Sequence, residues 1–345
     1  MKYRLLGRTG LHVSELCLGG MTFGGGEGFW KVMGNLGQQA VNEMVGHAFE
    51  RGINFIDTAN VYSTGQSESL IGQALRDLGL PRDQLVIATK ATGGMNELPN
   101  GRGQSRYHLM NQLDASLKRL QLDHVDLYQL HAFDSLTPLE DALSTLNDMV
   151  RSGKARYVGL CNMAAWQVMK ALAISDQNHW ARFASVQAYY TLAARDLERE
   201  LLPLIRDQQL GLMVWSPLAG GLLSGKFDRD GKGPGNTRRD TFDFPPMDRP
   251  RAFDCIDAMR PIAGRHGVSV AQVALAWLLA EPAVSTIIIG ARSMDQLKDN
   301  IAATKLRLST EDMTALNAVS QLPAEYPGWM LAMQARYREA VPERG

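Results

Sequence analysis

Eight short apolar segments alternate along this chain with segments of helical period. The apolar segments lie at 16–19, 53–57, 85–90, 125–131, 155–161, 184–190, 211–215 and 284–289. The intervening segments are amphipathic, and in 107–120, for example, Leu109, Leu113 and Leu117 share one face. Such alternation is typical of parallel strands joined by helical crossovers, and eight units in roughly 300 residues favour a closed barrel over an open sheet. We therefore predict an α/β fold, a (β/α)8 TIM barrel.

Three segments extend this minimal barrel, within a chain, 1–345, that we expect to form one domain. Residues 2–16, with a turn at Gly7 to Gly10, are predicted to form a β-hairpin that plugs the barrel floor. Residues 228–250 are rich in Gly, Pro and Arg, and so long a loop predicts a functional flap over the site. Residues 322–345 form a C-terminal extension that packs over the barrel mouth or covers a helix, two placements between which the sequence does not decide.

The composition narrows the range of partners. The 345 residues are 45% hydrophobic, which is enough for a large core, and Lys plus Arg and Asp plus Glu both number 36, so the net charge gives no basic face for nucleic acid. No stretch reaches the ~20 apolar residues of a membrane span. The three cysteines are odd in number and widely spaced, which disfavours a disulfide framework and a zinc site. We expect a cytoplasmic protein with small-molecule partners, without metal, and with an oligomeric state that the sequence leaves open.

Four polar residues of different chemical kinds follow the predicted strands. Asp57, Lys90 and His131 close three of them, and Tyr62 comes shortly after the first of these three. The carboxyl ends of parallel barrel strands meet at one rim, where such barrels keep their active sites. Each residue alone has an ordinary explanation, such as a helix cap, a solvated charge or a structural histidine. Together on one rim they predict a catalytic site.

This set of residues suits proton transfer to a carbonyl oxygen. A phenol such as Tyr62 has a pKa of ~10 and needs a cation beside it to become a better acid. Lys90 is predicted to supply that charge and to favour the phenolate, while Asp57 keeps Lys90 charged and oriented. His131 is predicted to reach the carbonyl oxygen and orient it by a hydrogen bond. The hydride itself requires a nicotinamide cofactor.

The residues around these four side chains resemble the signature blocks of the aldo-keto reductases. The blocks are NFIDTANVY at 54–62, TK at 89–90 and DLYQLH at 126–131, in the order of that family. The segment WSPLAGGL at 215–222 resembles the bacterial and potassium-channel β-subunit branch. The resemblance implies the barrel fold, carbonyl reduction and a nicotinamide cofactor.

The resemblance also implies a cofactor site that continues past the eighth strand. Trp215 offers a flat ring for nicotinamide stacking, and the amides of Asn162 and Gln187 suit its carboxamide, whereas Cys161 stands where many relatives have serine. Arg292 suits a 2′-phosphate, so we expect NADPH (NADP) to be preferred to NADH. The residues predicted to contact the cofactor are Met21, Asn162, Gln187, Trp215, Ser216, Leu218, Gly220, Lys226, Gly290, Arg292, Gln296, Asp299 and Asn300.

The predicted function is NADPH-dependent reduction of a small aldehyde or ketone to an alcohol, with Tyr62 as proton donor. Trp30, Phe133 and Trp329 are candidate walls of the substrate pocket. An NADPH-binding regulatory or redox-sensing subunit with little turnover is the alternative, although the channel β-subunits tend to lack a histidine where this chain has His131. A Schiff-base lyase is disfavoured, because Asp57 should keep Lys90 charged and a poor nucleophile.

Overall fold

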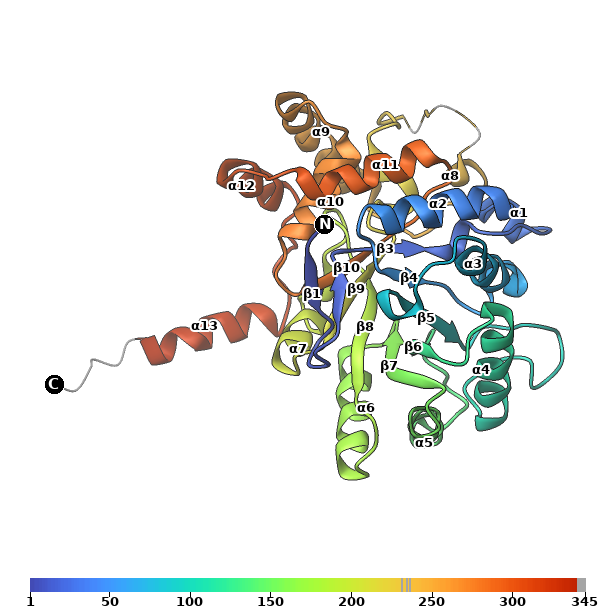
Figure 1. Cartoon of the computed structure of the whole chain (residues 1–345). Coiled ribbons are helices and arrows are strands. Elements are labelled where there is room, and N and C mark those ends of the chain that lie inside the picture. The colour runs from blue at the N-terminus through green and yellow to red at the C-terminus, as the bar shows by residue number, and fades with distance from the viewer. Residues whose placement is uncertain (231, 234, 236, 340–345) are drawn as a thin grey trace.

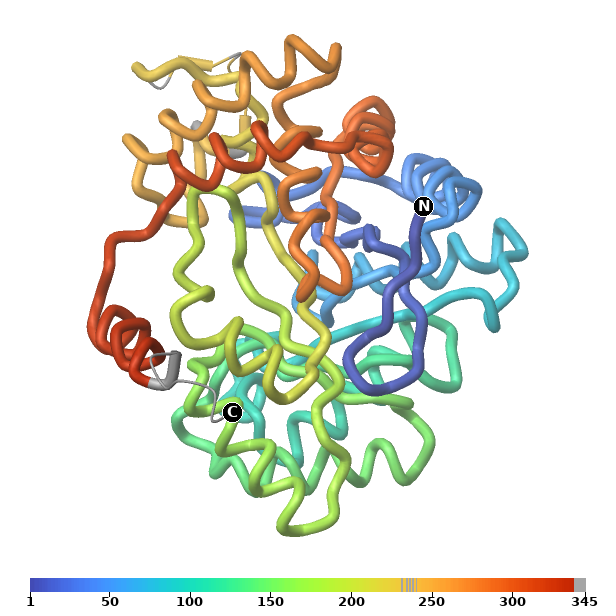
Figure 2. The backbone as a smooth tube through the Cα atoms, turned by 90° about the vertical axis from the view of Figure 1, so that its left-hand side faces the viewer, coloured from blue at the N-terminus to red at the C-terminus, as the bar shows by residue number. Residues whose placement is uncertain are grey.

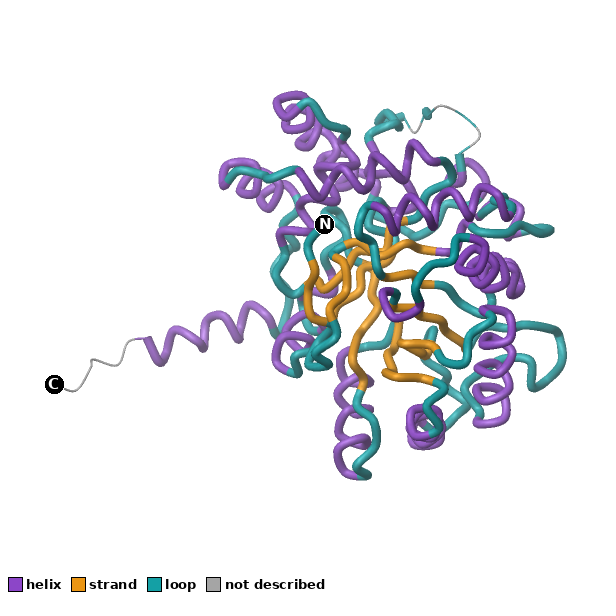
Figure 3. The backbone as a smooth tube through the Cα atoms, viewed as in Figure 1, coloured by secondary structure: helices purple, strands orange, loops and turns teal. Residues whose placement is uncertain are grey.

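The computed structural model describes residues 1–230, 232–233, 235 and 237–339. In this part of the chain, eight parallel strands form a closed barrel, and helices surround it (Figures 1 and 3). The strands, in chain order, are β3 (Leu16–Gly19), β4 (Phe55–Asp57), β5 (Val86–Ala91), β6 (Val125–Leu130), β7 (Ala155–Cys161), β8 (Phe183–Tyr189), β9 (Gly211–Trp215) and β10 (Val284–Ile289). Each strand pairs with the next one, and β10 pairs with β3 to close the ring. The prediction of a (β/α)8 barrel is confirmed.

The crossover helices turn their apolar faces to the barrel. In α5, for example, Leu143, Leu146 and Met149 are buried in the layer between helices and strands. The main helices are α2 (Gln38–Glu50), α3 (Gln66–Asp77), α4 (Arg106–Leu120), α5 (Leu139–Arg151), α6 (Ala165–Gln177), α7 (Leu201–Asp207), α9 (Arg249–His266), α10 (Val270–Ala280), α11 (Met294–Ala302) and α12 (Thr310–Val319). Within the described residues, no single helix is long and apolar enough to span a membrane, and α9 with α10 meets that criterion only as a pair bent by 98°.

A β-hairpin closes the floor of the barrel, as predicted. β1 (Tyr3–Leu5) pairs antiparallel with β2 (His12–Ser14). Leu6 and Val13 are fully buried and join an apolar cluster inside the barrel that includes Phe55, Leu127 and Met213. The barrel interior is therefore filled with side chains at its amino-terminal end, and a ligand has to enter from the other end.

The long segment after β9 folds back toward the barrel mouth. It contains the short helix α8 (Arg238–Thr241), while positions 231, 234 and 236 of the predicted flap lie outside the described residues. The Arg239 side chain is buried, and its guanidinium donates to the carbonyl oxygens of Ala219 and Pro245. This buried cation fixes the segment to the loop that follows β9.

The C-terminal segment leaves the barrel. Arg199 forms an ion pair with Glu325 at 3.1 Å, and α13 (Gly328–Glu339) then extends away from the barrel (Figure 1). Figure 2 shows the same helix nearly end-on. Leu331 and Tyr337 are 59% and 65% exposed. The helix therefore takes neither of the two placements considered from the sequence, and residues 340–345 lie outside the described part.

Candidate active site

The structure brings Asp57, Lys90 and Tyr62 into direct contact at the carboxyl ends of the strands. The Lys90 ammonium is completely buried and donates to Asp57 Oδ2 at 2.6 Å, to the carbonyl oxygen of Thr58 at 2.8 Å and to Tyr62 Oη at 3.4 Å. These three acceptors use all three N–H groups of the ammonium. Lys90 is therefore held charged and in one orientation, with a phenol as its third partner.

The pKa shifts of this group follow from burial and from the neighbouring charges. Burial lowers the pKa of Lys90, but attraction by Asp57 and Tyr62 outweighs it and leaves that pKa above its usual value. Burial raises the pKa of Tyr62, Lys90 lowers it and Asp57 raises it again, with a net increase. Lys90 favours the phenolate, as predicted, but the expected net lowering of the Tyr62 pKa is wrong, because desolvation of the phenolate outweighs the nearby cation. Tyr62 remains protonated at neutral pH, which is the form of a proton donor.

His131 faces Tyr62 across the mouth of the barrel. The two ring centroids are 5.7 Å apart and the ring planes are 75° apart. The His131 backbone N–H donates to the carbonyl oxygen of Ala91, which continues the β5 to β6 ladder by one residue and fixes the ring position. Burial and the charge of Lys90 lower the pKa of His131 to about 3. The imidazole is therefore neutral at physiological pH and carries one N–H group that can donate a hydrogen bond.

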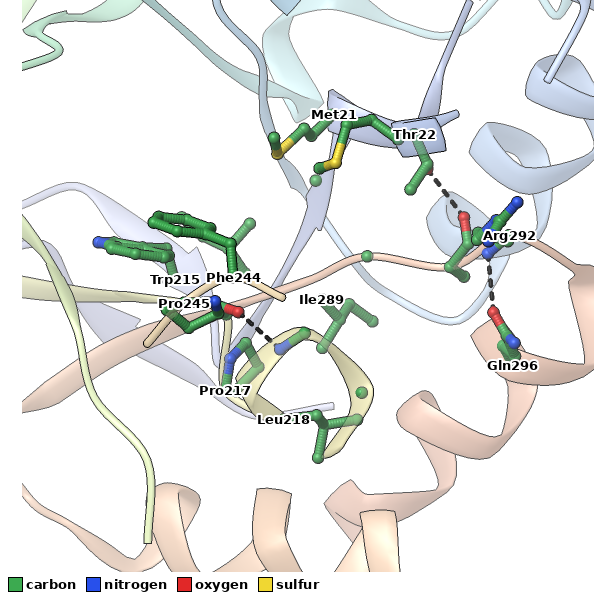
Figure 4. Close-up of a pocket in the computed structure, with 18 of the residues that line it drawn as sticks. Met21, Thr22, Trp215, Pro217, Leu218, Phe244, Pro245, Ile289, Arg292 and Gln296 are labelled. Carbon is green, nitrogen blue, oxygen red and sulfur yellow. Dashed lines mark hydrogen bonds between the residues drawn. The ribbon is translucent and has the colours of Figure 1, made fainter. Parts of the chain in front are cut away.

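A cavity of about 1320 Å³ opens directly in front of these residues. Asp57, Tyr62 and His131 line it, and Lys90 does not. All thirteen residues predicted to contact a cofactor also line it: Met21, Asn162, Gln187, Trp215, Ser216, Leu218, Gly220, Lys226, Gly290, Arg292, Gln296, Asp299 and Asn300. Figure 4 shows Trp215 and Phe244 on one side of the pocket and Arg292 with Gln296 on the other.

Trp215 and Asn162 form the end of the cavity nearest to His131. The Trp215 indole N–H donates to Asn162 Oδ1 at 2.9 Å, and Asn162 Nδ2 donates to the carbonyl oxygen of His131 at 3.1 Å. The Phe244 ring is nearly parallel to Trp215, with an angle of 8° and centroids 6.0 Å apart. These contacts place an aromatic face near His131. Gln187, in contrast, donates its amide to Asp57 Oδ1 at 3.1 Å.

The other end of the cavity lies at the start of α11. Ser293 caps this helix by accepting from the Gln296 backbone N–H, and Gln296 Oε1 accepts from the Arg292 N–H at 2.8 Å. Asn300 Nδ2 donates to the carbonyl oxygen of Gly290 at 3.3 Å. The Arg292 side chain is exposed and forms no ion pair with the described residues. A helix N-terminus with a guanidinium beside it is a favourable place for a phosphate.

Residues between the two ends also shape the cavity, and the sequence did not reveal all of them. Asp299 accepts from Ser269 Oγ at 2.7 Å and so anchors α11 to the start of α10. Gly220 has a φ of +63°, and a Cβ there would lie 2.5 Å from the carbonyl oxygen of Phe244, so only glycine lets the flap approach. Cavity residues missed by sequence reasoning include Thr22, Val61, Tyr189, Phe244, Pro245 and Ser293. Tyr189 could have been found, because it ends a barrel strand; Phe244 carries no such signal.

The candidate substrate walls are only partly correct. Trp30 lines the cavity, and its ring lies 6.1 Å from that of Tyr62. Phe133 is 40% exposed and Trp329 lies on the projecting α13, and neither lines the cavity. Phe133 lies partly exposed in the loop after β6, whereas the flap residue Phe244 lines the cavity.

The arrangement fits a nicotinamide dinucleotide. The cavity joins the flat indole of Trp215 to a helix N-terminus with an arginine. Gly220 and Gly221 both have positive φ and turn the loop between these two ends. The chemistry of the two ends matches a ring at one side and a phosphate at the other.

Comparison with known proteins agrees with this geometry. The aldo/keto reductase family model matches residues 15–321. The chain is 38% identical over 327 residues to the oxidoreductase YrpG of Bacillus subtilis (strain 168). The matched region covers 92% of this chain and 96% of that protein. It is 34% identical to the versiconal hemiacetal acetate reductase of Aspergillus parasiticus (95% and 99% covered) and 35% identical to a probable voltage-gated potassium channel subunit beta of Oryza sativa subsp. japonica (93% and 97% covered). The chain therefore belongs to the aldo/keto reductase family of oxidoreductases.

Proposed function

We propose that this protein reduces a small aldehyde or ketone to an alcohol with NADPH. The observation that carries the proposal is the Lys90 ammonium, which contacts both Asp57 and the Tyr62 phenol, two residues that line a cavity of about 1320 Å³. The reductase name of the Aspergillus relative supports the direction of the reaction. A regulatory NADPH-binding subunit is less favoured, because this chain keeps His131 opposite Tyr62.

The chain's own residues would act on the carbonyl oxygen. NADPH, when bound, supplies the hydride to the carbonyl carbon. Tyr62 is protonated and donates its phenol proton to the oxygen, which becomes the hydroxyl of the product. The phenolate left behind is stabilised by Lys90 Nζ at 3.4 Å. Neutral His131 donates an N–H hydrogen bond to the same oxygen and keeps it oriented toward Tyr62.

The cofactor contacts follow from the two ends of the cavity. Trp215 would stack on the nicotinamide, and Asn162 and Gln187 would bind its carboxamide. Arg292 would bind the 2′-phosphate with its guanidinium fork, which favours NADPH over NADH. Lys226, on the cavity wall, would contact the pyrophosphate.

The substrate and the compartment complete the proposal. Trp30, Phe244 and Met33 give the substrate end an apolar wall, which suits an aldehyde or ketone with an apolar part.

We place the protein in the cytoplasm, because the three cysteines are buried free thiols, which a reducing compartment maintains. A Schiff-base mechanism does not suit Lys90, whose ammonium is locked by three acceptors.

The test is oxidation of NADPH, followed by its absorbance, with a panel of aliphatic and aromatic aldehydes. Tyr62→Phe should lower kcat by roughly 10²–10⁴-fold and leave NADPH binding intact, since it removes only the proton donor. Tight NADPH binding without turnover of any carbonyl would instead support the regulatory function.

A further inference from the structure

Gln129 is a polar side chain inside the barrel to which the proposed reaction assigns no role. It lies on β6 and is completely buried. Two residues earlier on the same face, Leu127 packs in the apolar cluster of the barrel interior. The interior thus changes from apolar to polar at the level of Gln129. Burying an amide is unfavourable unless its atoms are hydrogen-bonded.

Both ends of the Gln129 amide have partners. Nε2 donates to Asp57 Oδ1 at 3.0 Å, and Oε1 accepts from Gln187 Nε2 at 3.3 Å and from Cys161 Sγ at 3.7 Å. The reversed amide would place Oε1 against the carboxylate of Asp57, which is repulsive. The partners therefore impose one orientation, with the donor toward Asp57.

The barrel leaves space for this side chain at a glycine. Gly159 on β7 is the register partner of Gln129. A Cβ at position 159 would lie 3.1 Å from Gln129 Cγ and 2.7 Å from Ser185 Oγ. A larger residue at 159 would displace the Gln129 side chain from Asp57.

The two amides on Asp57 differ in their access to ligands. Asp57 Oδ2 binds Lys90, and Oδ1 accepts from both Gln129 and Gln187. Gln187 lines the cavity, whereas Gln129 does not. Gln187 Nε2 uses its two N–H groups on Asp57 Oδ1 and Gln129 Oε1, so in the proposed function it gives up the bond to Asp57 when it turns to donate to the nicotinamide carboxamide. Gln129 is then the side-chain amide that remains on Asp57 Oδ1.

We propose that Gln129 is a positioning residue, which holds the Asp57 carboxylate, and through it Lys90, beside Tyr62 while Gln187 turns to the cofactor. The release of Gln187 rests on the proposed function, but the contact between Gln129 and Asp57 does not. A carboxylate fixed at both oxygens keeps the ammonium in place, which is how buried polar networks preorganise a site.

The first test is Gln129→Met, which keeps the size of the side chain and removes its hydrogen bonds. We expect kcat to fall roughly tenfold, in line with the loss of a hydrogen bond to a charged group, while the Kd for NADPH, from fluorescence titration, changes by less than about twofold. Leu127→Met is the matched control, since it alters packing on the same strand face without touching the amides. A kcat for Gln129→Met equal to that of the control would overturn the proposal.

The second test is Gln129→Glu, which rescues the contact only when it is protonated. At acid pH the carboxylic acid donates its O–H to Asp57 and kcat approaches that of the wild type, whereas ionisation at higher pH sets two carboxylates against each other and kcat falls. A kcat whose ratio to the wild type does not change with pH would contradict the proposed contact. If Gln129→Met does not fold, Gln129→Glu alone tests the proposal.

An infrared titration keeps the inference separate from the proposed reaction. The carboxylic-acid band of Gln129→Glu should disappear at a lower pH when Asp57→Asn is added, because the neutral amide no longer repels the charge at position 129. An unchanged midpoint would overturn the Gln129 proposal even in an active enzyme. A wild-type protein that binds NADPH and reduces no carbonyl would overturn the proposed function, and the infrared midpoint would still decide the contact.

Discussion

The Lys90 ammonium lies 2.6 Å from Asp57 Oδ2, and both side chains are nearly sealed from water, at 0% and 3% exposure. A charge in such a place depends on its partner, because desolvation of an unpaired ion is far more unfavourable than loss of an exposed pair. The same ammonium contacts Tyr62. Stability and the proposed catalysis therefore depend on one ion pair.

Asp57→Asn is expected to lower the free energy of unfolding by about 3–5 kcal/mol at neutral pH, since it leaves a buried ammonium without its counterion. In the wild type the pKa of Lys90 is raised, so its contribution is fully present below the unfolded pKa of ~10.4 and is lost as pH rises through the folded pKa. In the variant the pKa of Lys90 falls, and the deficit should shrink toward alkaline pH. Urea unfolding at neutral and at alkaline pH measures this loss of stability. Glu97→Gln, which breaks an exposed ion pair with Arg102, is the control. An equal loss in both variants would contradict the argument.

The depressed pKa of His131 gives a prediction of opposite sign. The folded protein holds this imidazole neutral down to about pH 3, whereas the unfolded chain protonates it near ~6.5. Between these values the unfolded state binds more protons, so the stabilising contribution of neutral His131 is lost as pH falls. As the pH falls from ~6.5 toward about 3, the free energy of unfolding should decrease more for the wild type than for His131→Gln. Denaturant titrations at several pH values measure this difference. An NMR titration of His131 with a midpoint near ~6.5 would refute the prediction.

Arg292→Ala should separate the two nicotinamide cofactors. Loss of a guanidinium from a 2′-phosphate is expected to raise the Kd for NADPH by roughly 10–100-fold and to leave the Kd for NADH unchanged. Arg292→Lys, which keeps the charge without the fork, should lie between the two. Fluorescence titrations with both cofactors provide the measurement, and an equal loss for NADH would mean that the residue acts elsewhere.

The floor of the barrel predicts a difference between two glycines of one turn. Gly7 and Gly10 have φ of +57° and +75°, so alanine at either position costs about 1–2 kcal/mol from the backbone alone. At Gly7 a Cβ would also lie 2.5 Å from the carbonyl oxygen of Ala184, whereas at Gly10 nothing lies within 4 Å. Gly7→Ala should therefore be the more destabilising in thermal unfolding by about 1–3 kcal/mol. Equal melting temperatures would show that the hairpin can move away from β8.

The strands were predicted well because apolar runs bounded by turns leave little choice. β7 and β10 have the predicted bounds, whereas β4 starts two residues late. Its expected first residue, Ile53, instead donates its backbone N–H to the carbonyl oxygen of Ala48 at the end of α2, which removes it from the ladder. The exact ends of helices and strands depend on local hydrogen bonds, which the pattern of apolar residues does not reveal.

The site was predictable where it depends on strand ends and unpredictable where it depends on packing. Asp57 ends β4 and His131 follows β6. The carboxyl ends of these strands meet at one rim of the barrel, so the proximity of the two residues could be inferred. The stacking of Phe244 on Trp215 brings together residues on a flap and on a strand, and no periodic signal connects them. The raised pKa of Tyr62 likewise results from how deeply the ring is buried, which the sequence does not give.

The contacts of the floor hairpin with β10 have a consequence for biosynthesis. Arg4 donates to the carbonyl oxygen of Val284 at 2.6 Å, and Thr286 Oγ1 donates to that of Ser14 at 2.8 Å. Arg4 and Ser14 are thus translated about 270 residues before their partners Val284 and Thr286. Until then the apolar residues of the hairpin have no final place, so a nascent chain stalled before β10 should be a substrate for chaperones and prone to aggregation.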